Sequence, residues 1–182
     1  MSQIQWQFDP SHSSIGFSVR HMMVSKVRGE FTKWNGTFAF DDARPEAAAV
    51  NITIDAASID TREAQRDGHL RSPDFFDAAT YPHLTFASTK VEKVGAGDFK
   101  VYGDLTIRGV TRPVVLDAEY SGQVKDMQGG TRAGFSAKTS IERKDFGLVW
   151  NVVLEAGGFA VADKVDIHLD IEAVQAVVAV AA

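Results

Sequence analysis

The feature that most constrains the fold of this chain is a two-residue alternation of apolar and polar side chains. In residues 14–21, for example, Ile15, Phe17 and Val19 share one face. The alternation recurs in residues 50–55, 101–108, 114–124, 132–142 and 165–172. A period of two is typical of a strand with one buried and one solvated face. Seven or more such strands, joined by short polar turns, predict an all-β antiparallel barrel or sandwich.

The length of the strands and the size of their inward side chains indicate an internal cavity. Residues 111–125 and 165–174 run well past the usual strand length. A strand of ~13 residues at ~3.3 Å each, tilted by ~40°, spans roughly 30 Å of barrel axis. Small residues such as Gly103, Ala118 and Ala137 alternate with large ones on the inward face. They leave space inside the barrel, and an elongated apolar space suits a long apolar ligand. The alternative is an ordinary core in which bulky neighbours fill the gaps.

Residues 26–40 allow two interpretations. The dipeptide Asn35-Gly36 is a strong hairpin-turn signal, and taken locally it joins two short strands. In the alternative, the segment is one long strand in which Gly36 marks a bulge or a bend.

One segment has a helical pattern, residues 61–70. Asp60 can cap it, Glu63 follows three residues later, and Ser72 and Pro73 end it. A single short helix among many strands suits a plug or rim at a barrel opening. No repeat or linker divides the chain, so we expect one domain over residues 1–182, with an apolar C-terminal tail at residues 174–182.

Charge and composition exclude several functions. The 19 Lys and Arg residues against 24 Asp and Glu residues give a net charge of -5, which argues against a nucleic-acid-binding protein. The absence of cysteine excludes disulfides, thiolate metal sites and a cysteine nucleophile. No motif such as G-x-S-x-G or H-E-x-x-H occurs, and the five histidines do not pair at metal-ligand spacing. We therefore expect neither a catalytic residue nor a metal site.

No stretch approaches the ~20 apolar residues of a membrane span. Residues 1–9 lack the basic region and apolar core of a signal peptide. We therefore expect a cytoplasmic protein, or a periplasmic or secreted one if a signal has been removed ahead of this sequence.

Three polar side chains are candidates for holding a ligand headgroup at the barrel mouth. His21 continues the apolar face of its strand, and His69 and Arg71 lie at the end of the predicted helix. Phe75 and Phe76 follow directly and would suit a lid over an apolar pore. In the structural alternative, His21 is a core residue, ion pairs anchor the helix end, and the phenylalanines simply pack.

A series of motifs runs in order along almost the whole chain. They are DPSHSSIGFSVRH at residues 9–21, VRGEF at 27–31, RDGHLRSPDFF at 66–76, YPHLTF at 81–86, GDLTIRGVTRP at 103–113 and RKDFG at 143–147. Together they resemble the YceI-like family, polyisoprenoid-binding proteins with a lipocalin-like barrel. The resemblance implies an elongated eight-stranded antiparallel barrel with a helix near its opening, and one long bent strand across residues 26–40. It also implies a lipid-like ligand, typically an isoprenoid chain or isoprenoid quinone, and no enzymatic activity.

We therefore expect a lipid-binding protein that serves transport, storage or sequestration and holds no cofactor. The inward faces and the lid segment predict these ligand-binding residues: Phe17, Val19, His21, Phe31, Phe38, His69, Arg71, Phe75, Phe76, Phe86, Leu105, Ala118, Phe135, Ala137 and Trp150. Two other classes stay open. One is an enzyme acting on a lipid-like substrate, with His21 beside Asp67 or His69. The other is a filled barrel that binds a partner, its tail at residues 174–182 pairing with an edge strand or with a second subunit in a homodimer.

Overall fold

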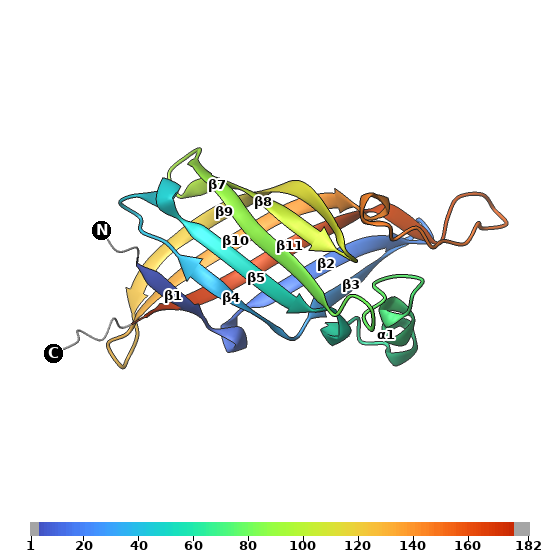
Figure 1. The fold of residues 1–182 in the computed structure, drawn as a ribbon, viewed down its shortest axis with the longest axis horizontal. Helices are drawn as coiled ribbons and strands as arrows, with labels where there is room; N and C mark the ends of the chain where they lie inside the picture. The colour runs from blue at the N-terminus through green and yellow to red at the C-terminus, as the bar shows by residue number, and fades with distance from the viewer. Residues whose placement is uncertain (1–3, 177–182) are drawn as a thin grey trace.

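The structure, a computed structural model, describes residues 4–176 (Figure 1). Its strands are β1 Gln5–Phe8, β2 Ser14–His21, β3 Ser25–Phe31, β4 Trp34–Ala39, β5 Ala49–Asp55, β6 Ile59–Asp60, β7 His83–Lys93, β8 Asp98–Ile107, β9 Val110–Lys125, β10 Thr131–Glu142 and β11 Val161–Gln175. Its helices are α1 Ala64–Arg71 and the short 3₁₀ turns Pro10–His12, Pro45–Ala47, Ala56–Ser58 and Arg143–Phe146.

These segments form a closed antiparallel barrel of eight strands, as predicted. Three of the eight strands are interrupted. β1 and β2 both pair with β11, on either side of the 3₁₀ turn Pro10–His12. β3 and β4 together form one bent strand, which pairs with β2 and β1 on one side and with β6 and β5 on the other, and this closes the ring. The barrel is elongated, and α1 lies at the end opposite β1 (Figure 1).

The segment from β3 to β4 follows the bent-strand interpretation, and the local hairpin prediction at Asn35-Gly36 is wrong. Both residues lie inside β4, opposite Thr53 and Ile52 of β5. A Cβ on Gly36 would stand 2.1 Å from the backbone oxygen of Asn51, so glycine is required by the close approach of the two strands. The bend lies at residues 32–33.

The helix begins later than the sequence pattern indicated. Asp60 does not cap it, because its carboxylate accepts a hydrogen bond from the backbone of Arg62 at 2.7 Å. Glu63 is the N-cap and accepts from the backbone N–H groups of the first turn. The carboxylate of Asp67, which is buried, accepts from the backbone and the hydroxyl of Thr61 at 2.9 and 2.6 Å. The helix is thus held to the strand that precedes it.

The interior contains two separate clusters of buried side chains. The first, in the half of the barrel next to α1 (the α1 half), is built largely from aliphatic residues and includes Ile54, Ile59 and Leu105. The second, in the half next to β1 (the β1 half), gathers aromatic rings from strands far apart in sequence. Its rings are Trp6, Phe38, Phe40, Phe99, Tyr120 and Phe135.

The described part of the predicted apolar tail is not free. Val174 and Gln175 end β11 and pair with Gln7 and Trp6 of β1, and residues 177–182 lie outside the described residues. This edge is therefore already covered within the chain. Within residues 4–176, α1 and the 3₁₀ turns are all too short or too polar to cross a membrane.

Candidate functional site

The α1 half of the barrel encloses a cavity of about 180 Å³. The wall residues come from β2, β3, β5 and β7 to β11, from the segment at α1, and from residues 143–148 after β10. Apart from Gly16, Thr139 and Arg143, they are all large and apolar: Ile15, Phe17, Val19, Phe31, Ile52, Ile54, Leu70, Phe75, Phe76, Leu84, Phe86, Leu105, Ile107, Val114, Leu116, Ile141, Leu148, Val161, Val165, Ile167 and Leu169. A cavity with such a wall excludes water and receives hydrocarbon.

The segment after α1 covers the end of this cavity. Phe75 is buried, and Phe76 meets the ring of Phe31 edge-on with centroids 5.7 Å apart. Arg108, in the turn between β8 and β9, donates to the backbone oxygen of Phe75 at 2.9 Å. Arg71 donates to the backbone oxygens of residues 57 and 59 at 2.7 and 3.0 Å. The segment is therefore positioned by hydrogen bonds from two arginines to backbone oxygens.

The structure brings seven of the predicted ligand-binding residues together in the cavity wall. They are Phe17, Val19, Phe31, Phe75, Phe76, Phe86 and Leu105. Gly103 makes room for one of them, since a Cβ there would stand 2.4 Å from the ring of Phe86. The alternation of faces located the strand residues among them, and the predicted lid segment supplied Phe75 and Phe76.

Four other predicted residues lie outside the cavity wall. Phe38, Ala118 and Phe135 belong to the β1 half, where the ring of Phe38 meets that of Phe135 edge-on at 5.0 Å. Ala137 pairs with Ala118 on one side and Leu169 on the other, between the two halves. The cavity expected from the inward side chains is therefore confined to the α1 half in this structure, because aromatic rings occupy the β1 half.

The polar candidates separate in the structure. His21 is exposed at the end of β2 and does not line the cavity. Arg71 serves as the helix anchor described above. His69 lies at the cavity end, where its Nε2 is 2.9 Å from Asp74 and its ring meets Trp150 and Phe75 edge-on at 4.6 and 5.0 Å. His69 and Trp150 are thus adjacent to the lid residue Phe75 without lining the cavity themselves.

Arg143 is a wall residue that sequence reasoning missed. It is buried, and its guanidinium donates to the backbone oxygens of Leu148, Trp150 and Ala162 at 2.6, 2.9 and 2.9 Å. Burial lowers the pKa of this guanidinium. Because its donors go to these backbone oxygens and to the carboxylate of Asp163 at 3.5 Å, the cation ties the loop before β11 to the barrel. The RKDFG motif contained it, but no pattern assigned it a role.

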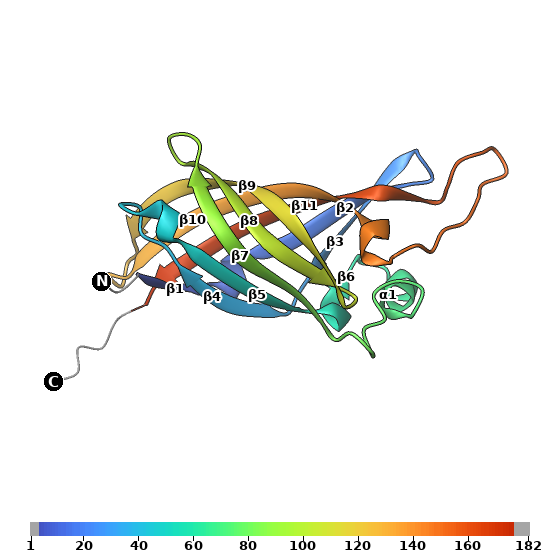
Figure 2. The same cartoon turned by 45° about the horizontal axis from the view of Figure 1, so that its top comes forward.

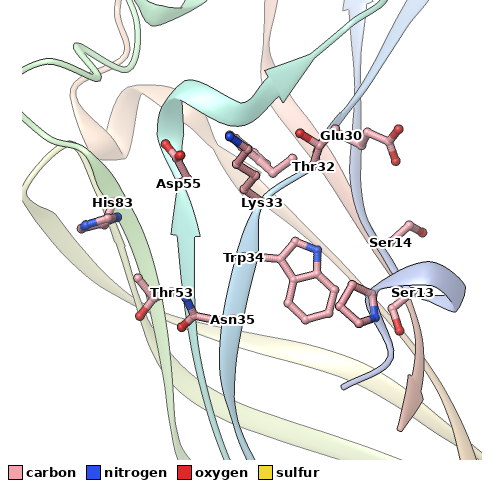
Figure 3. Close-up of a pocket in the computed structure, with 12 residues that line it drawn as sticks. Ser13, Ser14, Glu30, Thr32, Lys33, Trp34, Asn35, Thr53, Asp55 and His83 are labelled. Carbon is pink, nitrogen blue, oxygen red and sulfur yellow. The ribbon is translucent and has the colours of Figure 1, made fainter. Parts of the chain in front are cut away.

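A larger pocket, of about 650 Å³, lies outside the barrel at the bend between β3 and β4 (Figure 3). Its walls carry Glu30, Lys33, Asp55 and His83, and Figure 3 shows these groups spread around the pocket rather than converging on one point. Asp55 already accepts a hydrogen bond from the backbone of residue 57 at 2.9 Å. Mixed charge and dispersed geometry make this pocket a poorer candidate than the internal cavity.

One group of potential metal ligands exists within the described residues. Ligand atoms of Asp9, His12 and Glu172 lie within 4.8 Å of one another. Arg132 already bonds both carboxylates, through Nη1 to Asp9 at 2.8 Å and to Glu172, and pairs with Asp126 at 3.1 Å. The carboxylate of Asp9 also bonds to Ser11 and His12. The bonds to Ser11, His12 and Arg132 together hold the pKa of Asp9 well below its usual range. The group is an ion-pair network at the β1 end of the barrel, in which Arg132 already bonds both carboxylates.

Comparisons with known proteins agree with this architecture. The model of the YceI-like domain matches residues 6–173. Protein YceI of Escherichia coli is 44% identical over 164 residues, which cover 90% of this chain and 82% of that protein. The crystal structure of BcnA from Burkholderia cenocepacia superposes with a TM-score of 0.80 at 25% identity, covering 91% of this chain and 98% of that one.

A polyisoprenoid-binding domain from Saccharophagus degradans has the same fold, with a TM-score of 0.67. At 15% identity, over 96% of this chain and 100% of that one, this likeness concerns the fold alone. The match to the domain model and the identity to the Escherichia coli protein each span nearly the whole barrel. The chain therefore belongs to the YceI-like family.

Proposed function

We propose that this protein binds the hydrocarbon chain of an isoprenoid or similar lipid in the cavity of the α1 half. The observation that carries the proposal is the apolar wall of this cavity. Its one charged residue, Arg143, donates to backbone oxygens. The fold shared with a polyisoprenoid-binding domain supports it. Transport, storage or sequestration of the lipid follows as the role, without chemical conversion.

The size of the cavity bears on how much of a ligand it holds. Its volume of about 180 Å³ is below the ~300–1,000 Å³ of typical small-molecule sites. One isoprene unit adds five carbons, and burying it contributes roughly 3–4 kcal/mol before the cost of ordering the chain. We therefore infer that the end of the chain occupies the cavity and that the remainder passes the lid at Phe75 and Phe76.

The polar end of such a ligand would then lie outside the lid. Of the three polar candidates, His69 is the one in ring contact with Phe75, and its side chain is 38% exposed. We assign it the headgroup contact. His21 is exposed on the same end of the barrel, and Arg71 is engaged with backbone oxygens.

Organic extraction of the purified protein followed by mass spectrometry tests the proposal. A stoichiometric isoprenoid or similar lipid is expected. Val114→Phe, which places a ring in the cavity, should release it, whereas Val115→Phe on the outer face of the same strand should not. Protein that carries no lipid, takes up none when it is added, or loses it equally in both variants would contradict the proposal. Turnover of an added lipid would favour the enzyme instead.

A further inference from the structure

Exposed apolar side chains gather on two loops at the α1 end of the barrel, outside the cavity. We call them the apolar tips: Met22, Met23 and Val24 between β2 and β3, and Val152, Val153 and Phe159 between β10 and β11. Met23, Val24 and Val153 are 71%, 81% and 73% exposed. Both loops project from the same end of the barrel as α1 (Figure 2).

The two loops are joined and form one surface. The backbone N–H of Met22 donates to the oxygen of Ala160 at 2.8 Å. Asn151 bonds both the oxygen and the N–H of Val161, at 2.7 and 3.0 Å, and so fastens the base of the longer loop. Together with the bonds of Arg143, these contacts hold the tips outward instead of letting them fold onto the barrel.

The backbone of the shorter loop makes its apolar sequence unusual. Met22 and Met23 have φ angles of 50° and 62°, in the left-handed region. They are the two central residues of a turn closed by the bond from the N–H of Val24 to the oxygen of His21 at 3.2 Å. Positive φ at both positions favours Asn and Gly, which adopt it readily. Methionines at both positions add conformational strain to apolar exposure, which indicates a role that polar turn residues would not perform.

A row of basic side chains lies directly behind this turn. Arg20 and Lys26 are opposite one another across β2 and β3, and Arg28 is next along the same outer face. Opposed like charges destabilise a strand pair. None of the three forms an ion pair with another residue of the described chain. The nearby Asp166 bonds to Ser140 at 2.7 Å and Lys164 at 3.3 Å, and the charge of Lys26 acts on it without forming an ion pair.

We propose that the apolar tips insert into the surface of a lipid bilayer that contains anionic lipids, with Arg20, Lys26 and Arg28 against the headgroups. Apolar side chains backed by Lys and Arg are what peripheral proteins present to such a surface. This orientation turns the lid at Phe75 and Phe76 toward the bilayer, so a hydrocarbon chain passes to the cavity without crossing water. Docking extends the proposed lipid binding but does not require a ligand in the cavity.

Co-sedimentation with vesicles tests docking on the whole protein without added ligand. Vesicles of phosphatidylcholine mixed with phosphatidylglycerol are compared with vesicles of phosphatidylcholine alone. The triple variant Met23→Asn, Val24→Ser, Val153→Ser should weaken binding on the order of tenfold, because three apolar side chains no longer enter the bilayer. The double variant Arg20→Gln, Lys26→Gln should remove the preference for phosphatidylglycerol.

The opposite end of the barrel supplies a matched control, Met127→Asn, Val124→Ser, Val94→Ser, which changes one exposed methionine and two exposed valines. It should bind as the wild type does. Equal binding by both triple variants, or a wild type that does not bind, would overturn the proposal. A wild-type dimer that the tip variant dissociates, without vesicle binding, would also overturn it, because a second copy would then cover the tips. Organic extraction of the tip variant gives a second readout. If the variant still carries lipid but no longer binds vesicles, it has lost docking and kept the cavity.

Discussion

The two halves of the barrel share their strands but differ in what those strands enclose. In the α1 half, mostly aliphatic side chains, with five phenylalanines among them, line a cavity of about 180 Å³. In the β1 half, rings from β4, β8, β9 and β10 meet the ring of Phe40, with centroids 4.9 Å from Tyr120 and 5.1 Å from Phe135. The rings of the β1 half pack against one another, whereas the side chains of the α1 half leave space between them. One half is thereby suited to stabilise the fold and the other to receive a ligand.

The largest effect is expected from removing a ring of the β1 half. Phe40 is 4% exposed, and its backbone oxygen accepts from the indole of Trp6 at 2.9 Å. Phe40→Ala should cost ~3–5 kcal/mol of unfolding free energy, because it leaves a cavity among rings that cannot close over it. Denaturant unfolding measures this cost, and lipid extracted from the folded fraction should be unchanged. Intact stability would mean that the β1 half is loosely packed.

Adding an aromatic ring to the interior also distinguishes the two halves of the barrel. Ala137→Phe, between the halves and outside the cavity wall, should overpack the interior and cost ~1–3 kcal/mol. Val114→Phe should cost less than ~1 kcal/mol, because the cavity receives the ring, but it should displace the lipid. Thermal melting with a lipid-displacement assay on both variants gives opposite pairs of outcomes. If Ala137→Phe keeps its stability and loses lipid, the open pore extends past the α1 half.

The ion-pair network at the β1 end predicts a pH dependence of stability that lipid binding does not share. Asp9 raises the pKa of His12 above its ordinary value of 6.5, by a hydrogen bond and by its charge. The stability contributed by His12 is therefore fully present below about pH 6.5 and is lost as the pH rises through the raised pKa. Because the pKa of Asp9 is lowered in the folded protein, Asp9 contributes stability that is fully present above about pH 3.8. This stability is lost as the pH falls through the lowered pKa.

Thermal melts across pH measure both limbs. His12→Ala should flatten the limb above about pH 6.5 and leave lipid retention unchanged. A limb that persists in the variant would assign the dependence to another group.

The smallest effect on stability is expected at the mouth. His69→Ala removes a half-exposed side chain and should change the unfolding free energy by less than ~1 kcal/mol. It should weaken binding of an isoprenoid that carries a polar headgroup more than binding of the bare hydrocarbon. Titration of both ligands into wild type and variant measures the difference. His21→Ala is the matched control, and equal losses for the two ligands would assign His69 a packing role.

Local pattern predicted the wall of the barrel better than its contents. Alternation placed Phe17, Phe86 and Leu105 on the inward face, because a strand's period of two is a property of neighbouring residues. It could not show that Phe38 and Phe135 meet at 5.0 Å, since that contact arises only when β4 and β10 are brought across the closed barrel. The same limit explains the mouth, where His21 keeps the inward phase but lies beyond the wall at the end of its strand.

Photo-crosslinking with an isoprenoid that carries a diazirine at the end of its chain tests the division between the halves most directly. After irradiation and digestion, mass spectrometry locates the labelled residues. The account predicts labels on cavity-wall residues such as Leu105, Val114 and Ile141, and their loss in Val114→Phe. Labels on Phe38 or Phe135 would show that the chain enters the β1 half. An absence of specific labelling would show that the barrel does not hold the chain. Either result would contradict the account.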